Sequence, residues 1–176
     1  SRINAPARLD LLRRASRCYG RSALMLSGGA GLIYFHHGVI GELAEHKALP
    51  KVLSGASAGS WICVQVGVKT DAELSQGYFE QQRYHALSPQ VLREMFQGKG
   101  KGTVRATRYR EEVIDSFCND MSFQEAYEHT GRYINITVSP AERHQKARLL
   151  NALTSPNVTL RSATKASSAI PGFVAP

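Results

Sequence analysis

Residues 52–61 read VLSGASAGSW and hold the pattern that decides the fold. Within them, Gly55-Ala56-Ser57-Ala58-Gly59 is a G-x-S-x-G pentapeptide, which places a serine on a tight turn between a strand and a helix. The short apolar run before it predicts a buried strand, and residues 61–68, apolar on nearly every side, predict an enclosed helix. We therefore expect Ser57 at a strained turn, with Gly55 and Gly59 leaving room for the flanking elements.

A second glycine-rich turn lies upstream, after another apolar run. Residues 23–26 (ALML) predict a buried strand, and residues 27–31 (SGGAG) separate it from a helix. Small residues let backbone N–H groups face a cavity, where they can hold the oxyanion that forms when a serine attacks an ester. A dinucleotide site matches less well, because Tyr34 occupies the third glycine position of G-x-G-x-x-G. The backbone amides that we expect to form an oxyanion hole are those of Gly28, Gly29 and Ala30.

Strands alternate with helices along the rest of the chain. Helices are predicted at residues 34–47, after a capping box at Thr70, from Ser88 to Gln97, at 107–118 and at 122–129, and strands at 133–138 and 147–150. Residues 98–102 (GKGKG) predict a loop, because they offer little to pack. The alternation predicts an α/β fold of three layers, with a central mostly parallel sheet covered by helices on both faces.

Composition indicates one globular domain with a substantial core. The chain has 176 residues, of which 43% are hydrophobic and 20% charged. We expect residues 1–20 to form an amphipathic lead-in helix and residues 21–176 to form the domain. No run approaches the roughly 20 apolar residues that cross a bilayer, and the first residues have no signal-peptide pattern.

Charge and cysteine spacing limit the classes of ligand. The net charge of +8 fits attraction to anionic lipid surfaces or to nucleic acid, but an ordinary solvated basic surface is the favoured interpretation. Aromatic residues are not interleaved with the basic ones to stack bases, so we do not expect nucleic acid. Cys18, Cys63 and Cys118 lie far apart without metal-ligand spacing, and we interpret them as reduced, buried thiols. Neither a metal nor a cofactor is expected.

Three ordered blocks resemble the patatin-like phospholipase family. They are residues 26–30 with 36–39, residues 54–60, and residues 166–173 with Pro176. Residues 20–24 and 125–132 are also similar to the branch that contains triacylglycerol lipases. The resemblance implies a three-layer α/β/α patatin-like domain, a Ser-Asp dyad with Ser57 as nucleophile and no histidine, and the glycine-rich loop as the oxyanion hole.

Two departures from the family pattern bear on the site. The family's aspartate lies in an Asp-Gly-Gly or Asp-Gly-Ala motif after the segment that matches Pro171 to Pro176. Ile33 stands near a position where the family usually has another glycine, which affects the path of the loop. None of the four aspartates of this sequence is followed by glycine; they are Asp10, Asp71, Asp115 and Asp120. The resemblance therefore places the base beyond residue 176 and implies that this piece alone is inactive.

The implied function is hydrolysis of glycerolipid esters, with peripheral contact to a membrane or another lipid surface. Two alternatives stay open: a lipid-binding module without turnover, and a Ser-His-Asp esterase, because Asp115 or Asp120 and then His129 or His144 follow Ser57 in order. We expect His36 and His37 to be structural. The sequence does not rank phospholipid, triacylglycerol and lysophospholipid substrates, and it leaves compartment and oligomeric state open. Core packing is favoured over an acyl-chain pocket for Tyr78, Phe79, Tyr84, Met95 and Phe96.

Overall fold

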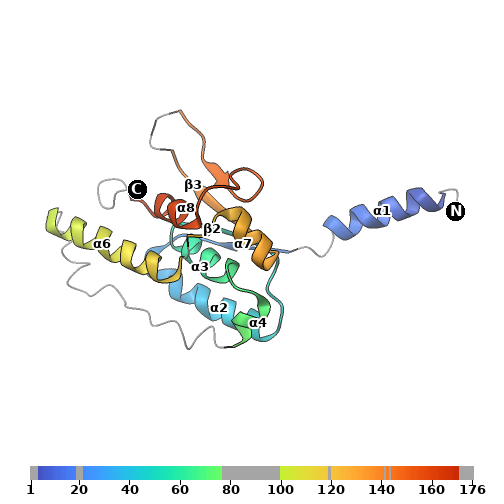
Figure 1. Cartoon of the computed structure of the whole chain (residues 1–176), viewed down its shortest axis with the longest axis horizontal. Coiled ribbons are helices and arrows are strands. Elements are labelled where there is room, and N and C mark those ends of the chain that lie inside the picture. Colours follow the sequence, from blue (N-terminus) through green and yellow to red (C-terminus); the bar gives the residue numbers. More distant parts are fainter. Residues whose placement is uncertain are drawn as a thin grey trace.

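A single mixed sheet organises the domain. The computed structural model describes residues 4–18, 22–76, 100–118, 120–140, 142 and 144–170. Its sheet has four strands in the order β1-β2-β3-β4, of which the first three are parallel and β4 is antiparallel to β3 (Figure 1). The α/β class with a central, mostly parallel sheet is therefore confirmed. The strands are β1 (Ala23–Leu26), β2 (Val52–Ala56), β3 (Tyr133–Val138) and β4 (Arg148–Leu150).

Helices connect the parallel strands and close the core. Between β1 and β2 lie the short 3-10 helix η1 (Ala30–Leu32) and α2 (Ile33–Glu45); α3 (Ala58–Gly67) and α4 (Asp71–Ser75) follow β2. The helices α6 (Gly100–Phe117) and α7 (Phe123–Thr130) come before β3, and α8 (Leu160–Ser167) comes after β4. The first helix, α1 (Ala5–Cys18), lies apart from the sheet and its helices (Figure 1).

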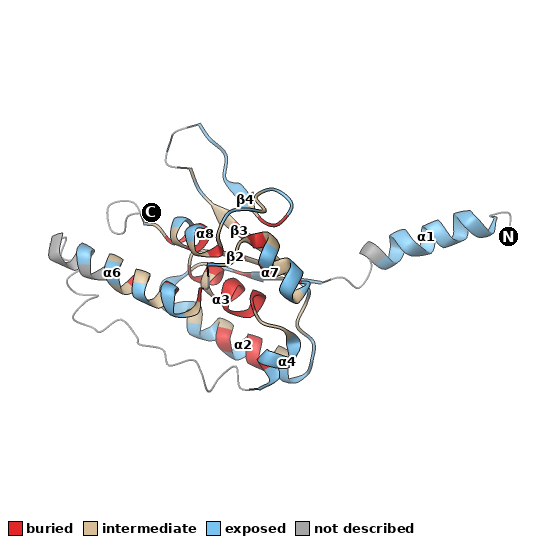
Figure 2. Ribbon diagram, in the orientation of Figure 1, coloured by how far each residue is buried: buried red, intermediate tan, exposed pale blue. Residues whose placement is uncertain are grey.

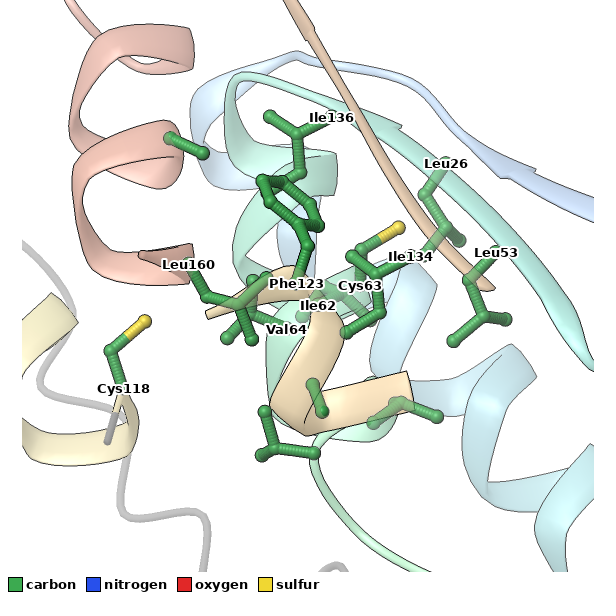
Figure 3. Close-up of a cluster of buried hydrophobic side chains, with 14 of the residues drawn as sticks. Leu26, Leu53, Ile62, Cys63, Val64, Cys118, Phe123, Ile134, Ile136 and Leu160 are labelled. Carbon is green, nitrogen blue, oxygen red and sulfur yellow. The ribbon is translucent and has the colours of Figure 1, made fainter. Parts of the chain in front are cut away.

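One face of the sheet carries the core. Both crossovers step in the same direction, from β1 to β2 and from β2 to β3, and right-handed crossovers of this kind put α2 and α3 on the same face. On the other face, Met25 of β1 is 74% exposed. Among the described residues, one buried cluster joins strand side chains with side chains of α2, α3, α6, α7 and α8 (Figures 2 and 3); its members include Leu53, Ile136, Ile40, Ile62, Ile114, Phe123 and Leu160.

The helix α3 is enclosed, as its apolar sequence predicts. Ile62, Cys63 and Val64 are all fully buried, and in Figure 3 they lie in the same cluster as the strand side chains. Trp61 lies at the edge of the cluster with its ring centroid 6.1 Å from that of Phe117 in α6. Burial raises the pKa of the Cys63 thiol, which agrees with a reduced, unreactive cysteine. The start of α3 is therefore held firmly against the sheet.

Local sequence patterns correctly predicted the start of two further helices. The capping boxes at Thr70 and Ser122 open α4 and α7 as predicted, and α7 ends at Gly131, whose φ is 67°. The predicted loop at residues 98–102 is wrong for residues 100–102, because α6 begins at Gly100. The helix predicted from Ser88 to Gln97 lies outside the described residues. In the part of the chain that the structure describes, no helix is long and apolar enough to cross a bilayer.

Candidate active site

Ser57 occupies the turn between β2 and α3. Its φ of 51° and ψ of −122° lie in a region that side-chain-bearing residues rarely adopt. Ser57 is the N-cap residue of α3, yet its side chain makes no capping hydrogen bond, although a serine at that position usually accepts one from the first turn. The hydroxyl is thus not used to cap α3, and the helix N-terminus favours negative charge beside it.

The two glycines of the pentapeptide allow β2, α3 and β1 to approach closely. A Cβ atom at Gly59 would lie 2.6 Å from the carbonyl carbon of Leu26, at the end of β1. A Cβ atom at Gly55 would lie 2.8 Å from Sγ of Cys63, one turn into α3. Real Cβ atoms do not approach other atoms so closely, so both positions require glycine for α3 to begin where it does.

The upstream glycine loop lies directly against the serine. A Cβ atom at Gly28 would be 3.0 Å from Cβ and 3.7 Å from Oγ of Ser57. Gly29 has a φ of 141° and Ala30 a φ of 47°, so the chain turns sharply where η1 begins. Ile33 opens α2 at a φ of −50° and a ψ of −33°, an ordinary helical conformation that needs no glycine. The structure therefore brings Gly28, the first of the three residues expected to form an oxyanion hole, next to Ser57.

The chain matches the family model described as Patatin-like phospholipase over residues 24–176. It belongs to the patatin-like phospholipase family. It is 41% identical over 180 positions to Triacylglycerol lipase SDP1L of Arabidopsis thaliana. The aligned region covers 97% of this chain and 22% of that protein. It is 36% identical over 175 positions to Triacylglycerol lipase 4 of Saccharomyces cerevisiae, and the aligned region covers 94% of this chain and 19% of that protein. The chain thus spans about a fifth of the length of these two relatives.

A solved structure is also similar to this patatin-like chain. ExoU, crystallised with SpcU from the type III secretion system of Pseudomonas aeruginosa, superposes with a TM-score of 0.47 at 13% identity, covering 84% of this chain and 38% of ExoU. A second crystal structure of ExoU gives a TM-score of 0.46 at 19% identity, covering 86% of this chain and 40% of that chain.

Both histidines beside the patatin-like glycine loop have structural surroundings. Nε2–H of His36 donates a hydrogen bond of 2.8 Å to the carbonyl oxygen of Ser27, which fixes the start of the loop. His37 is only 5% exposed. Burial, and after it the charge of neighbouring His36, lowers the pKa of His37 to about 4, so this ring is neutral at physiological pH.

The aspartates of the sequence are all engaged by arginines. Arg132, which holds Asp71, is fully buried and also donates to the carbonyl oxygen of Lys69. His129, a candidate for a triad, lies with Nε2 3.7 Å from the carboxylate of Glu73. These pairings give no support to a Ser-His-Asp triad. The arginine pairs are Asp10 with Arg14 at 2.9 Å, Asp71 with Arg132, and Asp115 and Asp120 with Arg161 at 3.2 and 3.3 Å.

Some expected site features fall outside the described residues. The aromatic and methionine side chains weighed as an acyl-chain pocket lie within residues 77–99, and the third family block is described only as far as Ile170. A hollow of about 280 Å³ lies between α4 and the C-terminal end of α2, whereas the glycine loop adjoins the other end of α2. Among the described residues, no group of three or more histidine, cysteine, aspartate or glutamate side chains could hold a metal ion.

One residue at the site was not predicted from the sequence. Ser167, the last residue of α8, accepts a hydrogen bond of 2.9 Å from the backbone N–H of Ser57. It lies in the third block that resembles the family, but no local pattern assigns that serine a partner. Only the folded chain brings the two serines together.

Proposed function

We propose that this chain carries the nucleophile of a serine lipid acyl hydrolase that cleaves glycerolipid esters. The observation that supports this most is the geometry of Ser57: a strained strand-to-helix turn, a hydroxyl not used for capping, and the Gly28 backbone beside it. Membership of the patatin-like phospholipase family and the names of the two lipases from Arabidopsis thaliana and Saccharomyces cerevisiae agree with this reaction. Residues 21–176 would be the N-terminal and central part of the catalytic domain, and residues 1–20 a lead-in helix.

The proposed reaction proceeds through an acyl-enzyme. Oγ of Ser57 attacks the ester carbonyl carbon while its proton passes to a base, and backbone amides of residues 28–30 hold the resulting oxyanion. The ester C–O bond then breaks, and the leaving alcohol takes the proton. Water attacks the acyl-serine with the same base accepting its proton, which releases the fatty acid and restores the Ser57 hydroxyl.

We place the base outside residues 1–176. Each aspartate within them is paired with an arginine, and none precedes a glycine as the family's catalytic aspartate does. The proposed base is therefore an aspartate in an Asp-Gly-Gly or Asp-Gly-Ala sequence after residue 176. Residues 1–176 alone should hydrolyse esters only at a rate near that of the Ser57→Ala variant.

Contact with a lipid surface is part of the proposal. Leu32, Phe35 and Val39 are 54%, 73% and 50% exposed, and their spacing places them on one side of η1 and α2. Leu32 packs beside Gly29, where a Cβ atom would lie 3.3 Å from Cβ of Leu32. This apolar surface, which we call the α2 patch, is thus continuous with the loop that touches Ser57. We propose that it rests on the glycerolipid surface from which substrate enters.

Labelling with a fluorophosphonate tests the nucleophile. The full-length protein should form an adduct on Ser57 and hydrolyse emulsified triacylglycerol or phospholipid vesicles, and Ser57→Ala should lower hydrolysis at least about 1,000-fold because no nucleophile remains. Ser116→Ala is the matched control, since Ser116 is exposed on α6 and its Oγ donates to the carbonyl oxygen of Val113 in the same helix. Comparing the two substrates ranks triacylglycerol against phospholipid.

Two outcomes would contradict the proposal. Undiminished hydrolysis in Ser57→Ala would place the nucleophile elsewhere. Lipid binding by the full-length protein without any adduct or turnover would favour the alternative of a non-catalytic lipid-binding module.

A further inference from the structure

Ser167 joins three elements at the active-site end of the sheet. Its Oγ accepts a hydrogen bond of 2.9 Å from N–H of Ser57, and donates one of 2.7 Å to the carbonyl oxygen of Thr137. Thr137 lies near the end of β3, where it pairs with Ala56, the residue before Ser57. One hydroxyl at the end of α8 therefore ties the nucleophile turn to the neighbouring strand.

These two bonds require a hydroxyl. The N–H of Ser57 belongs to a turn, and a partly buried N–H without a hydrogen-bond partner destabilises the fold. A single hydroxyl oxygen can accept from an N–H and donate to a carbonyl at the same time, whereas an alanine at position 167 would leave both groups without it. Ser167 thus satisfies a backbone group at a strained turn.

The peptide groups on both sides of Ser57 are fixed in this way. Ser167 holds the N–H of Ser57, and Ser60 holds its carbonyl oxygen. That oxygen accepts a 2.6 Å hydrogen bond from Oγ of Ser60 and a 2.9 Å hydrogen bond from the backbone N–H of Ser60. Of these three hydrogen bonds, only the one to Ser167 comes from outside β2 and α3. It therefore ties the backbone of the turn to α8 and β3.

The next residue provides a comparison within the same helix. Ser168 is buried, and its Oγ donates to the carbonyl oxygen of Thr164, 2.7 Å away in α8. The described bonds of Ser168 stay within the last turn of the helix. Two adjacent serines thus differ in whether they reach the nucleophile turn.

We propose that Ser167 is a positioning residue for the nucleophile: by holding the N–H of Ser57 against the end of β3, it keeps Oγ of Ser57 in line with the ester carbonyl. This inference rests on the proposed function, in which Ser57 is the nucleophile. Misplacing a reacting group by about 1 Å costs about 100-fold in rate, so loss of this contact should lower kcat by about 10- to 100-fold. Because Ser167 contacts backbone, KM should change by less than about 2-fold.

The experiment compares variants of the full-length protein on a soluble short-chain p-nitrophenyl ester. Ser167→Ala and Ser167→Cys should lower kcat and the rate of fluorophosphonate labelling at Ser57, with KM nearly unchanged. Ser167→Thr, which keeps the hydroxyl, should recover at least part of kcat, and Ser168→Ala should match the wild type. Ser167→Cys keeps an atom at the γ position, so it tests the role of the Ser167 hydroxyl even where Ser167→Ala does not fold.

The outcomes separate this inference from the proposed function. If Ser57→Ala abolishes turnover but Ser167→Ala and Ser167→Cys keep wild-type kcat and labelling rates, the positioning role of Ser167 is overturned while the proposed function stands. A lower melting temperature with unchanged kcat, or a fall in Ser168→Ala as large as in Ser167→Ala, would also overturn it. If Ser57→Ala keeps wild-type turnover, the proposed function fails as well.

Discussion

At the scale of single residues, His37 couples the stability of the fold to pH. Burial, and then His36, lowers the pKa of His37 to about 4, whereas an unfolded chain keeps a histidine near 6.5. Between these values the unfolded chain binds more protons, so this contribution to stability is present above about pH 6.5 and is lost as the pH falls towards 4. We expect the free energy of unfolding to be about 1–2 kcal/mol lower at about pH 5 than at about pH 7 because of this group, which urea denaturation at both pH values measures.

Substitution assigns that pH dependence to one ring. His37→Asn should reduce the change in stability between the two pH values, while His144→Asn should leave it as in the wild type. His144 is exposed, and asparagine tolerates its positive φ of 69°. An unchanged pH dependence in His37→Asn would mean that another group binds the protons.

At the scale of elements, the close approach of α3 to β1 depends on one missing methyl group. An alanine at position 59 would place Cβ 2.6 Å from the carbonyl carbon of Leu26 and 2.7 Å from the carbonyl oxygen of Ser27, both rigid backbone. We expect Gly59→Ala to lower the free energy of unfolding by about 3 kcal/mol and to slow fluorophosphonate labelling, because α3 must move away from β1. Urea denaturation and the labelling rate measure the two effects.

The matched control lies in the neighbouring helix. Gly38 of α2 has no atom within 4 Å of an added Cβ, and alanine is the better helix former, so Gly38→Ala should be neutral or stabilise the fold by up to about 1 kcal/mol. Equal stability of the two alanine variants would show that α3 tolerates a larger separation from β1 than the structure indicates.

At the scale of the whole molecule, the α2 patch is the surface through which we propose that the active site meets its lipid substrate. Phe35 is 73% exposed, and burying a phenylalanine side chain in lipid contributes about 1.5–3 kcal/mol. We expect Phe35→Ser in the full-length protein to weaken binding to vesicles of phosphatidylcholine and phosphatidylserine about 10-fold or more. Sedimentation with the vesicles measures binding, and turnover of a soluble short-chain ester should not change.

The control has a side chain that is just as exposed, on another surface. Leu153 is 80% exposed and follows β4, and Leu153→Ser should bind vesicles as the wild type does. Equal binding by all three proteins would place the lipid contact elsewhere in the molecule.

Sequence patterns predicted the elements that depend on nearby residues. β1 and β3 lie where their apolar and β-branched runs predict them, and the capping boxes at Thr70 and Ser122 begin their helices. The predicted loop at residues 98–102 failed in its second half. A glycine-rich segment has low helix propensity, but α6 packs Ile114 into the core and Arg110 donates to the carbonyl oxygen of Lys165 in α8, and packing of this kind outweighs local propensity.

The amino-acid sequence by itself determined the turn at Ser57, because glycines at fixed spacing between an apolar strand and an apolar helix act within a few residues of one another. The tertiary structure alone decided that Ser167 holds the N–H of Ser57, and that Gly28 lies against its side chain. Those contacts join residues far apart in the chain. They depend on the register of β1, β2 and β3 and on the packing of α8, and short-range spacing carries no information about either.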